Sequence, residues 1–422
     1  MTTGSPPTAR AANRRWYVLT ILVGAVTLSY VDRYALAILI QPVKRDLHLS
    51  DTQIGWLVGF AFAATYAFVG VPVARYADRG HRRRVIGWSV AAWSLMTASC
   101  GFAQGFLQLA AARFGVGVGE AGALPASQSM VTELFPPERR NTALALLACG
   151  SGLGLMIAFS LGSVLDHRVG WRWTFVAVAL PGLLLFLLVR FCLDELPVAP
   201  RAASDDSQGG VRVSTGALRE LLGNKIFRHL PFAQAANVVL LFGQAQWIPA
   251  YVERSFGAPR SQIGPMLALM QGGAGLVGTL LGGLIADRLV RRGVDGPIRL
   301  ALTATLAGII PLVAIYFVPT ASAVYPLAGL MTLCFSIPSA AIFSTLQNSV
   351  PPSTRATAAA IAAMVAAVVG LGGGPLLIGF LSDHFQAAHG RGSLRIALIV
   401  TDALAAPWML FHLWRVLRAL RG

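Results

Sequence analysis

The sequence predicts an all-α polytopic membrane protein whose twelve transmembrane helices form two six-helix bundles related by a pseudo-twofold axis. Apolar runs of about 20 residues, the length that crosses the hydrocarbon core of a bilayer, recur along the whole chain. Only 12% of the residues are charged, which is about half the fraction found in soluble domains. The two halves also share three similar motifs in the same order. These observations together indicate a helical membrane protein built by duplication.

The predicted spans divide into two sets of six, separated by a polar segment. The segment 193–227 is rich in Pro, Gly, Ser and charged residues, which is typical of a linker. We therefore predict an N-terminal bundle over 16–192, a cytoplasmic linker over 193–227 and a C-terminal bundle over 228–415, with cytoplasmic tails at 1–15 and 416–422. The expected spans are 16–40, 54–75, 85–103, 106–133, 141–165, 172–192, 228–252, 262–285, 298–318, 322–349, 356–381 and 394–415.

The basic residues predict the orientation of the chain. The formal net charge is +16, from 34 basic and 18 acidic residues. Arg and Lys gather in every second loop and in both tails, so the positive-inside rule places both termini in the cytoplasm. This topology explains the basic charge, and we expect no nucleic acid partner. The basic N-terminal tail precedes a first span too long for a cleaved signal, which indicates an integral plasma membrane protein, with the bacterial inner membrane expected.

The two halves of the chain repeat each other. Three motifs recur in the same order and at nearly constant spacing, which indicates a duplicated six-helix unit in parallel orientation. One match places Asp78 over Asp287, and another places Asp166 over Asp383. The matching segments are GVPVARYADRGHRR (70–83) with GGLIADRLVRRG (282–293), LFPPERRNTALA (134–145) with SVPPSTRATAAA (349–360), and LGSVLDH (161–167) with LIGFLSDH (377–384).

This architecture resembles the major facilitator superfamily, in which two six-helix halves surround a central substrate site. The N-terminal half is similar to the spinster-like branch, whose members share an acidic–Arg pair in the first helix and a glycine-rich segment with Arg and Glu in the fourth. Here these are SYVDRY (29–34) and RFGVGVGEAG (113–122). The resemblance implies a lipid-like substrate such as a lysophospholipid or sphingoid phosphate, often moved with proton coupling.

Four ionisable residues lie inside otherwise apolar spans, namely Asp32, Arg33, Arg113 and Glu120. A charge at membrane depth costs about 3 kcal/mol on insertion scales, so such residues are functional candidates. Asp32 and Arg113 lie at similar predicted depth and are expected to pair. Asp32 is the candidate proton carrier, and Glu120, two turns from Arg113 on the same face, is a second proton-coupling candidate. The alternative is a set of static interhelical contacts.

Arg33 and Arg113 are the expected binding groups for an anionic headgroup, because guanidinium suits phosphate and carboxylate. Arg33 is also placed to reach Glu120. The repeat positions in the second half carry no charges, so we predict that charge chemistry is confined to the first half. The last helix is usually peripheral in the superfamily that the chain resembles, so Asp402 is expected to have a structural role. Polar and aromatic residues there are expected to complete the substrate site, with helix packing as the alternative: Gln244, Gln246, Trp247 and Tyr251.

Loop motifs predict gates on the cytoplasmic side. The segment with Asp78 resembles the loop-2/3 motif of the superfamily, where ion pairs close that side, and the segment with Asp287 is its second copy. Charged residues at the end of the fourth span and the start of the fifth are expected to join this network. The predicted gating residues are Asp78, Arg79, Arg82, Glu133, Arg140, Asp287 and Arg288.

The sequence therefore predicts a proton-coupled secondary transporter of an amphipathic, lipid-like anion that works by alternating access. A transporter of small organic anions and a multidrug exporter are the alternatives. The glycines of 115–122 lie inside a membrane span and are not a phosphate loop, so we expect no enzyme and no cofactor. The four cysteines lack metal-type spacing, so no metal is expected. The expected partners are the anionic substrate, protons and membrane lipids, and we expect a monomer.

Overall fold

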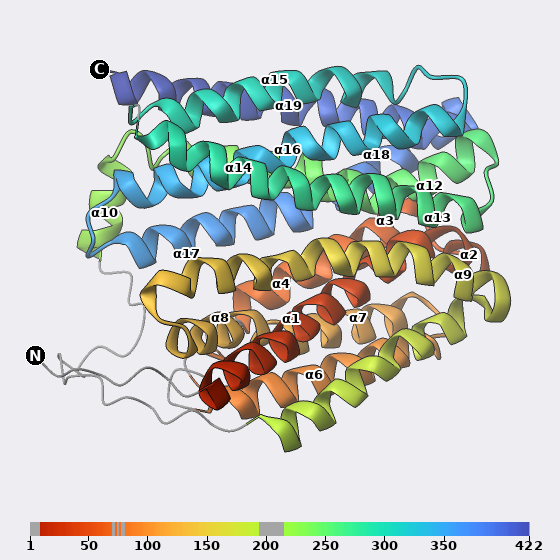
Figure 1. Cartoon of the computed structure of the whole chain (residues 1–422). Coiled ribbons are helices and arrows are strands. Elements are labelled where there is room, and N and C mark those ends of the chain that lie inside the picture. Colours follow the sequence, from red (N-terminus) through yellow and green to blue (C-terminus); the bar gives the residue numbers. More distant parts are fainter. Residues whose placement is uncertain are drawn as a thin grey trace, which may run out of the picture.

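The computed structural model describes residues 9–69, 72–73, 76, 81–193, 215–291 and 293–421. Two groups of roughly parallel helices lie against each other, one from the first half of the chain and one from the second (Figure 1). The start of α1 at Ala9 and the end of α19 at Arg421 lie at one end of the helices, which we call the terminal side. The opposite end, which carries Asp51 and Gly257, is called the far side.

The N-terminal bundle contains the first six predicted spans. The predicted span 106–133 is broken after Glu120, where the chain makes a short turn before the next helix. The fifth and sixth spans form one continuous element that changes direction at Gly170, whose φ of 78° is a conformation that favours glycine. The elements are α1 (Ala9–Ile38), α2 (Ile40–Asp46), α3 (Asp51–Gly55), the π-helix η1 (Trp56–Phe60), α4 (Ala61–Phe68), α6 (Arg82–Cys100), α7 (Phe106–Glu120), α8 (Ala123–Leu134) and α9 (Pro137–Cys192).

The C-terminal bundle contains the other six spans, and three of these are interrupted by π-helices. Most of the predicted linker, residues 194–214, lies outside the described residues. The elements are α10 (Thr215–Gly223), α11 (Leu230–Val238), η3 (Val239–Gly243), α12 (Gln244–Phe256), α13 (Arg260–Leu267), η4 (Ala268–Gly273), α14 (Ala274–Val290), α15 (Gly296–Ala314), α16 (Ala321–Ser349), α17 (Arg355–Val365), η5 (Ala366–Gly373), α18 (Gly374–His389), the short η6 (Gly390–Gly392) and α19 (Ser393–Arg421).

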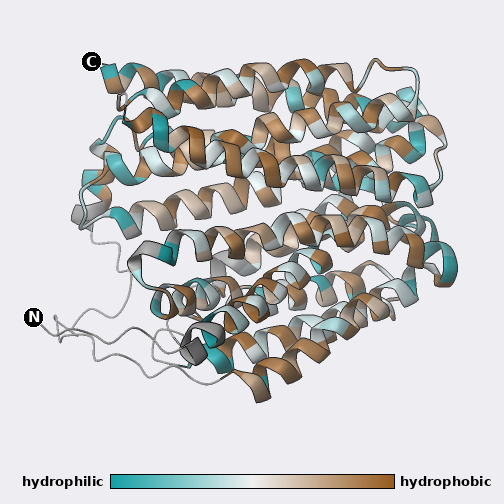
Figure 2. Ribbon diagram, viewed as in Figure 1, coloured by the Kyte–Doolittle hydropathy of each residue, from teal (hydrophilic) through white to brown (hydrophobic). Residues whose placement is uncertain are grey.

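The outside of the helices is apolar along most of its length. Hydrophobic residues cover the outward helix faces, while hydrophilic residues gather at the two ends of the molecule (Figure 2). Large side chains such as Leu184, Ile310 and Phe411 are exposed there. Six of the described helices are individually long and apolar enough to cross a membrane. This distribution is that of an integral membrane protein, in which lipid covers the outer face.

Glycines set the closest helix contacts inside the N-terminal bundle. A Cβ on Gly117 would lie 2.3 Å from Oγ1 of Thr65, and one on Gly119 would lie 2.6 Å from the main-chain nitrogen of Trp93. These positions hold α7 tightly against α4 and α6. The glycine-rich segment thus serves close helix packing, which positions Arg113 and Glu120 at its two ends.

Candidate functional site

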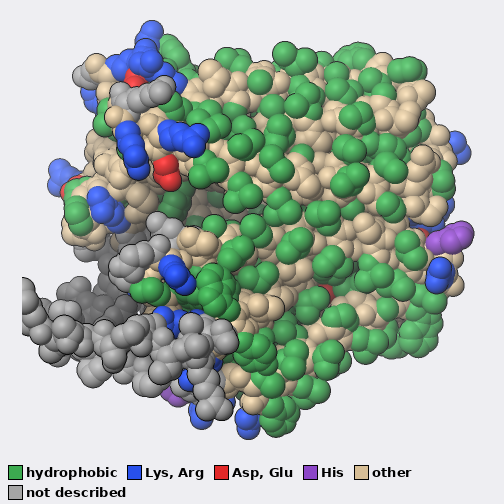
Figure 3. All heavy atoms as spheres, in the orientation of Figure 1, with side chains coloured by type: hydrophobic (Ala, Val, Ile, Leu, Met, Phe, Trp, Pro, Cys, Tyr) green, Lys and Arg blue, Asp and Glu red, His purple; other side chains and the backbone are tan. Residues whose placement is uncertain are grey.

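A cavity of about 710 Å³ lies between the two bundles. Its wall combines residues of α1 and α9 with residues of η3, η4, α14 and α16, so both halves contribute. The cavity extends to Thr142 and Asp287, and a hollow between the halves is visible toward the terminal side (Figure 3). Within the described part of the chain, its charged lining residues are Arg33 and Asp287. The rest of the wall is mostly apolar and glycine-rich, with a few hydroxyl and amide groups.

Arg33 faces this cavity from α1 and forms a buried ion pair with Glu120 of α7. Its Nη2 donates to Oε2 of Glu120 at 2.5 Å. The other carboxylate oxygen of Glu120 has no hydrogen-bond partner among the described residues. This contact is the one that the sequence predicted for Arg33. Because Glu120 is buried behind the wall, Arg33 links the cavity to a carboxylate that the cavity itself does not contact.

The contact between Arg113 and Asp32 differs from the predicted ion pair. Nη1 of Arg113 donates to the main-chain carbonyl oxygen of Asp32 at 3.1 Å. Within the described residues, these two side chains form no ion pair, and Oδ1 of Asp32 has no hydrogen-bond partner. The reason is that the Arg113 guanidinium lies over the ring of Phe62, 4.5 Å from its centroid, and meets the backbone of α1 instead. The predicted side-chain pairing is therefore wrong in this conformation.

Phe62 is a site residue that the sequence reasoning missed. Its ring lies 4.5 Å from the guanidinium carbon of Arg113 and 5.3 Å from that of Arg33. Arg33 also lies over the ring of Tyr30 at 4.8 Å. Cation–π contacts of this kind stabilise desolvated guanidinium groups, by about 2 kcal/mol in dry surroundings. Nothing in the sequence distinguishes Phe62 from the other aromatic residues of apolar spans, so only the fold reveals its position.

The four predicted substrate residues of the C-terminal half are all fully buried outside the cavity wall. Nε1 of Trp247 donates to the Pro375 carbonyl oxygen at 3.1 Å, and the Tyr251 hydroxyl donates to that of Ile315 at 3.2 Å. Neither Nε2 nor Oε1 of the Gln246 side chain has a partner among the described residues. Gln244 bonds elsewhere, as described next. In this conformation these residues pack the bundle, and their contact with substrate stays a prediction.

Asp402 corrects the prediction that buried charge is confined to the N-terminal half. It lies on α19, is 6% exposed, and accepts hydrogen bonds from Gln244 and from Tyr316. Gln244 occupies the region that the repeat aligned with Asp32. The last helix was expected to be peripheral, but α19 packs against α11, α15 and α18, which encloses the carboxylate.

Gln271 adds an unsatisfied polar group to the cavity. It lies in the π-helix η4 and is 2% exposed, and neither amide atom has a hydrogen-bond partner among the described residues. An unpaired amide costs about 1–3 kcal/mol when buried in protein, so this group is a candidate to bind a ligand in the cavity. Thr332 and Ser336 of α16 lie on the same wall, but their hydroxyls donate to their own helix.

The structure describes only some of the predicted cytoplasmic gating residues. Asp78 and Arg79 lie outside the described residues. Arg82 forms an ion pair with Glu133, as expected for a network that joins the two loops. Arg140 and Arg288 have no ion pair with a described residue. Asp287 is exposed on the cavity wall and has no ion-pair partner among the described residues. The gating role of all seven residues stays a prediction.

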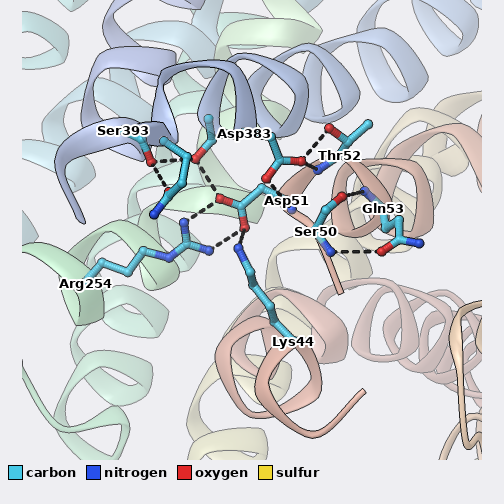
Figure 4. Close-up of polar contacts among 10 residues, drawn as sticks. Lys44, Ser50, Asp51, Thr52, Gln53, Arg254, Asp383 and Ser393 are labelled. Atoms are coloured by element: carbon cyan, nitrogen blue, oxygen red, sulfur yellow. Dashed lines mark hydrogen bonds and ion pairs between the residues drawn. The ribbon is translucent and has the colours of Figure 1, made fainter. Parts of the chain in front are cut away.

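The far side is closed by a polar cluster, here called the far-side junction: Lys44, Asp51, Thr52, Arg254, Ser382 and Asp383 (Figure 4). The two guanidinium nitrogens of Arg254 bind the Asp51 carboxylate, each at 2.6 Å. Lys44 and Ser382 donate to the same carboxylate at 2.5 and 2.6 Å. Because Asp51 belongs to the first half and Arg254 and Ser382 to the second, the cluster ties the bundles together.

The junction also caps a helix across the interface. Asp383 of α18 accepts hydrogen bonds from the main-chain nitrogens of Asp51 and Thr52, at 2.9 and 2.7 Å, in the first turn of α3. A carboxylate at a helix N-terminus satisfies free N–H groups and suits the helix dipole. A second cross-bundle ion pair joins Asp166 to Arg260 at the start of α13. Asp166 and Asp383 are the residues that the repeat placed over each other, so the two contacts are related by the duplication.

Charge balance at the junction keeps Asp51 ionised. Burial raises the pKa of Asp51, but the hydrogen bonds and charges of Arg254 and Lys44 outweigh burial and lower the pKa to about 2. The junction was not predicted, because in the sequence its residues look like ordinary loop charges. The available signal was the repeat itself, since the register that aligns Asp78 with Asp287 also aligns Asp51 with Arg260.

No group of three or more His, Cys, Asp or Glu side chains that could hold a metal ion exists among the described residues. The arrangement instead offers a cavity with one guanidinium, two carboxylates enclosed behind it, and a closed polar junction at one end. Chemically it can bind an anion at Arg33 and move a proton at a buried carboxylate.

Comparisons with known proteins agree with this architecture. A family model described as Major Facilitator Superfamily matches residues 22–375. The chain is 34% identical to an MFS-type efflux pump of Mycolicibacterium smegmatis, over 92% of this chain and 90% of that protein. It is 28% identical to protein spinster homolog 3 of Danio rerio, over 90% and 80%. A crystal structure of a bacterial homolog of the human lysosomal transporter Spinster, inward-facing and unoccupied, matches with a TM-score of 0.82 and 24% identity over 99% of both chains.

Proposed function

The chain belongs to the major facilitator superfamily, and from that premise we propose that it is a proton-coupled secondary transporter of an amphipathic, lipid-like anion, such as a lysophospholipid or sphingoid phosphate. It works as a monomer by alternating access between its two bundles, in a bacterial inner membrane with both termini in the cytoplasm. The observation that carries the substrate class is the cavity wall, in which Arg33 stands beside a largely apolar surface.

The headgroup binds at Arg33 and Gln271. The guanidinium supplies charge-assisted, bidentate hydrogen bonds to a phosphate or carboxylate, and the unpaired Gln271 amide supplies a donor and an acceptor. The acyl or sphingoid chain lies against the leucines of α14 on the same wall, among them Leu276, Leu280 and Leu284. A volume of about 710 Å³ suits a ligand of this size.

Proton coupling follows from competition for Arg33. An anion that binds Arg33 weakens its ion pair with Glu120 and leaves that carboxylate buried without a cation. An isolated buried charge is costly, so Glu120 takes up a proton as the anion binds. Asp32, whose Oδ1 lacks a partner, is the second acceptor in the same cluster. In this scheme Arg113 holds the backbone of α1 at Asp32 and does not itself release a carboxylate.

The conformation supports the cycle. The far-side junction is closed and the cavity extends toward the terminal side, which supports an inward-open state when both termini are in the cytoplasm. Opening the far side requires Arg254 and Asp383 to leave Asp51 and Thr52. Closing the terminal side brings together the predicted gate residues around Arg82, Glu133 and Asp287.

Flux measurements on the full-length protein in proteoliposomes test this proposal. A fluorescent lysophospholipid is expected to accumulate under an imposed pH gradient. Asp32→Asn and Glu120→Gln should abolish gradient-driven accumulation but leave substrate exchange without a gradient. Asp295→Asn, a change at a carboxylate outside the cavity, is the matched control. Gradient-driven uptake that survives both neutral variants would exclude the proton role, and failure of every phosphate-bearing lipid to bind or compete would exclude the substrate class.

Export of amphipathic drugs is the second candidate, and the 34% identity to a protein named as an efflux pump favours it. A drug exporter should accept cationic amphipaths and depend on Glu120 more than on Arg33. Competition in the same proteoliposomes separates the two, with soluble organic anions as a third arm. A cationic dye that displaces the lysophospholipid and is still transported by Arg33→Ala would favour the exporter.

A further inference from the structure

Asp402 lies in a buried polar cluster that the transport scheme above does not use. Nε2 of Gln244 lies 2.8 Å from both carboxylate oxygens of Asp402, and the Tyr316 hydroxyl donates to Oδ2 at 2.5 Å. The same Nε2 also donates to the Tyr316 oxygen at 2.9 Å. All three residues are buried, and none lines the cavity between the bundles. The cluster joins α12, the turn after α15, and α19.

The hydrogen-bond partners of this carboxylate among the described residues are neutral. The nearest arginine on its own helix, Arg395, lies two turns away with its guanidinium over Phe317. Tyr251 of α12 packs edge-on against Tyr316 but bonds to a main-chain oxygen. A carboxylate without a cation inside a helical bundle is expensive to keep ionised, whereas its protonated form is not.

The other charged or titratable groups near α19 are engaged elsewhere or exposed. His412 bonds to His229, Arg299 and Arg421 bind Asp295, and Arg254 and Asp383 belong to the far-side junction. Glu253 pairs with Arg45. Cys334, on α16, is partly buried. The exposed groups are His384, His389, Arg391, Arg415 and Arg418.

Gln244 shows what protonation would change. Its Oε1 is buried and has no partner among the described residues, while its Nε2 is shared between three oxygens. A protonated Asp402 presents an O–H donor, which a turned amide accepts at Oε1, while the Tyr316 hydroxyl continues to donate to the other carboxyl oxygen. Gln244 is the first residue of α12, directly after the π-helix η3. π-helical segments of this kind mark functional positions in helices, so a change at Gln244 acts where α12 is least regular.

We propose that Asp402, Tyr316 and Gln244 form a proton-binding site in the C-terminal bundle, separate from Asp32 and Glu120 and outside the substrate cavity. A proton from water binds a carboxylate oxygen of Asp402, and the Gln244 amide turns over to accept it. The site gives the C-terminal bundle its own dependence on pH, whatever substrate the protein carries.

Infrared difference spectroscopy of the full-length protein in lipid nanodiscs tests this, because a protonated carboxyl has a C=O stretch that a carboxylate lacks. Lowering the pH from about 8 to about 5 is expected to produce a carboxylic acid band that Asp402→Asn removes. Asp295→Asn is the control and should leave it in place. Identical pH-difference spectra of wild type and Asp402→Asn would overturn the proposal, since Asp402 would then keep either its charge or its proton throughout.

Three further measurements keep the test independent of folding and of transport. Tyr316→Phe retains Asp402 but removes a hydrogen bond, so the band should shift in frequency; an unshifted band would contradict the cluster. Asp32→Asn should retain the Asp402 band even though it abolishes gradient-driven flux, which separates the two proposals. Exchange of sodium for choline should change nothing, and a band that appears only on removing sodium would assign the site to a metal cation instead of a proton.

Discussion

The far-side junction and the central cavity belong to the same interface between the bundles but treat polar side chains in opposite ways. At the junction, Asp51 receives hydrogen bonds from Arg254, Lys44 and Ser382. In the cavity, which Arg33 also lines, the Gln271 amide has no partner among the described residues. Polar groups whose hydrogen bonds are completed by the partner bundle hold the interface closed. Those left incomplete are available to a ligand.

Removal of Arg33 is expected to have the largest effect, because it affects both the cavity and a buried ion pair. Arg33→Ala should reduce kcat/KM for an anionic substrate by about 100-fold, or about 3 kcal/mol, since the headgroup loses its cation and Glu120 is left unpaired. Proteoliposome uptake measures the change. Arg45→Ala, at an arginine whose side chain is 69% exposed, is the control and should stay within experimental error. A loss of less than threefold for Arg33→Ala would contradict the site.

Loss of charge at the junction should open the far side. Asp51→Asn removes the bidentate contact with Arg254 and is expected to favour the outward-open state by about 2 kcal/mol, which is about 30-fold in the ratio of open to closed. Distances between spin labels at the exposed positions His48 and Ser255 report this ratio. Arg254→Gln alone should act similarly, and the double variant should add little. Fully additive effects would show that the two residues do not work as a pair.

A single methyl group should break the same closure sterically. A Cβ on Gly55 would lie 2.5 Å from the carbonyl oxygen of Pro375, so Gly55→Ala forces α3 and α18 apart. Overpacking of this kind costs about 1–3 kcal/mol and should shift the spin-label distances toward the open state. Gly273→Ala is the matched control, because nothing lies within 4 Å of its added Cβ. Equal behaviour of the two variants would argue against close packing as a part of the closure.

A substitution at Gln271 tests the cavity, and we expect a smaller effect than from the substitutions above. Gln271→Leu should weaken substrate binding by about tenfold, or about 1.4 kcal/mol, because one hydrogen bond to the ligand is lost. The same change removes a buried unpaired amide, so the thermal stability of the empty protein should hold or rise. Binding titrations and thermal unfolding measure the two quantities separately. Lower stability together with unchanged binding would show that Gln271 stabilises the fold and does not bind the substrate.

The junction should be insensitive to mild acid. The pKa of Asp51 in the folded protein is about 2, below its ordinary value of 3.8, so its ion pairs stabilise the closed state fully above about pH 4. This contribution, about 2 kcal/mol, is lost only as the pH falls from about 4 toward 2. In Glu120→Gln, which lacks the proposed proton-binding carboxylate at Glu120, Asp51 should therefore cause no change in the spin-label distances between about pH 8 and 5. Opening of the wild-type junction at mildly acidic pH would point to another titrating group.

The features that could be predicted from the sequence are those determined by the length of the apolar runs and by the internal repeat. The spans, the duplication and the contact between Arg33 and Glu120 all follow from spacing along helices. Partners across the interface do not, because Asp51 and Arg254 are 203 residues apart and carry no shared pattern. The sequence therefore predicted charges for the terminal side, where the loop motifs lie, and missed the junction on the other.

Buried polar residues were the least predictable. Gln244 and Tyr251 look like cavity residues in sequence, since both are polar and lie on an amphipathic helix. The direction in which α12 packs decides whether they face the cavity or the bundle interior, and helix rotation is not encoded in composition. Asp402 was undervalued for the same reason, because the enclosure of α19 depends on neighbours that lie far from it in the chain.

The stack of Arg33 and Arg113 with Phe62 has a mechanical consequence. Phe62 belongs to the rod formed by α3, η1 and α4, whose first turn Asp383 holds at the junction. Eleven residues of helix, about 16 Å, separate Asp51 from the ring. One end of the rod is thus held by the opposite bundle, and Phe62, toward its other end, contacts two guanidinium groups. When the hydrogen bonds to Asp383 break, the rod moves and displaces the Phe62 ring that contacts both arginines. The state of the far side thus reaches the binding site through the backbone of one helical segment.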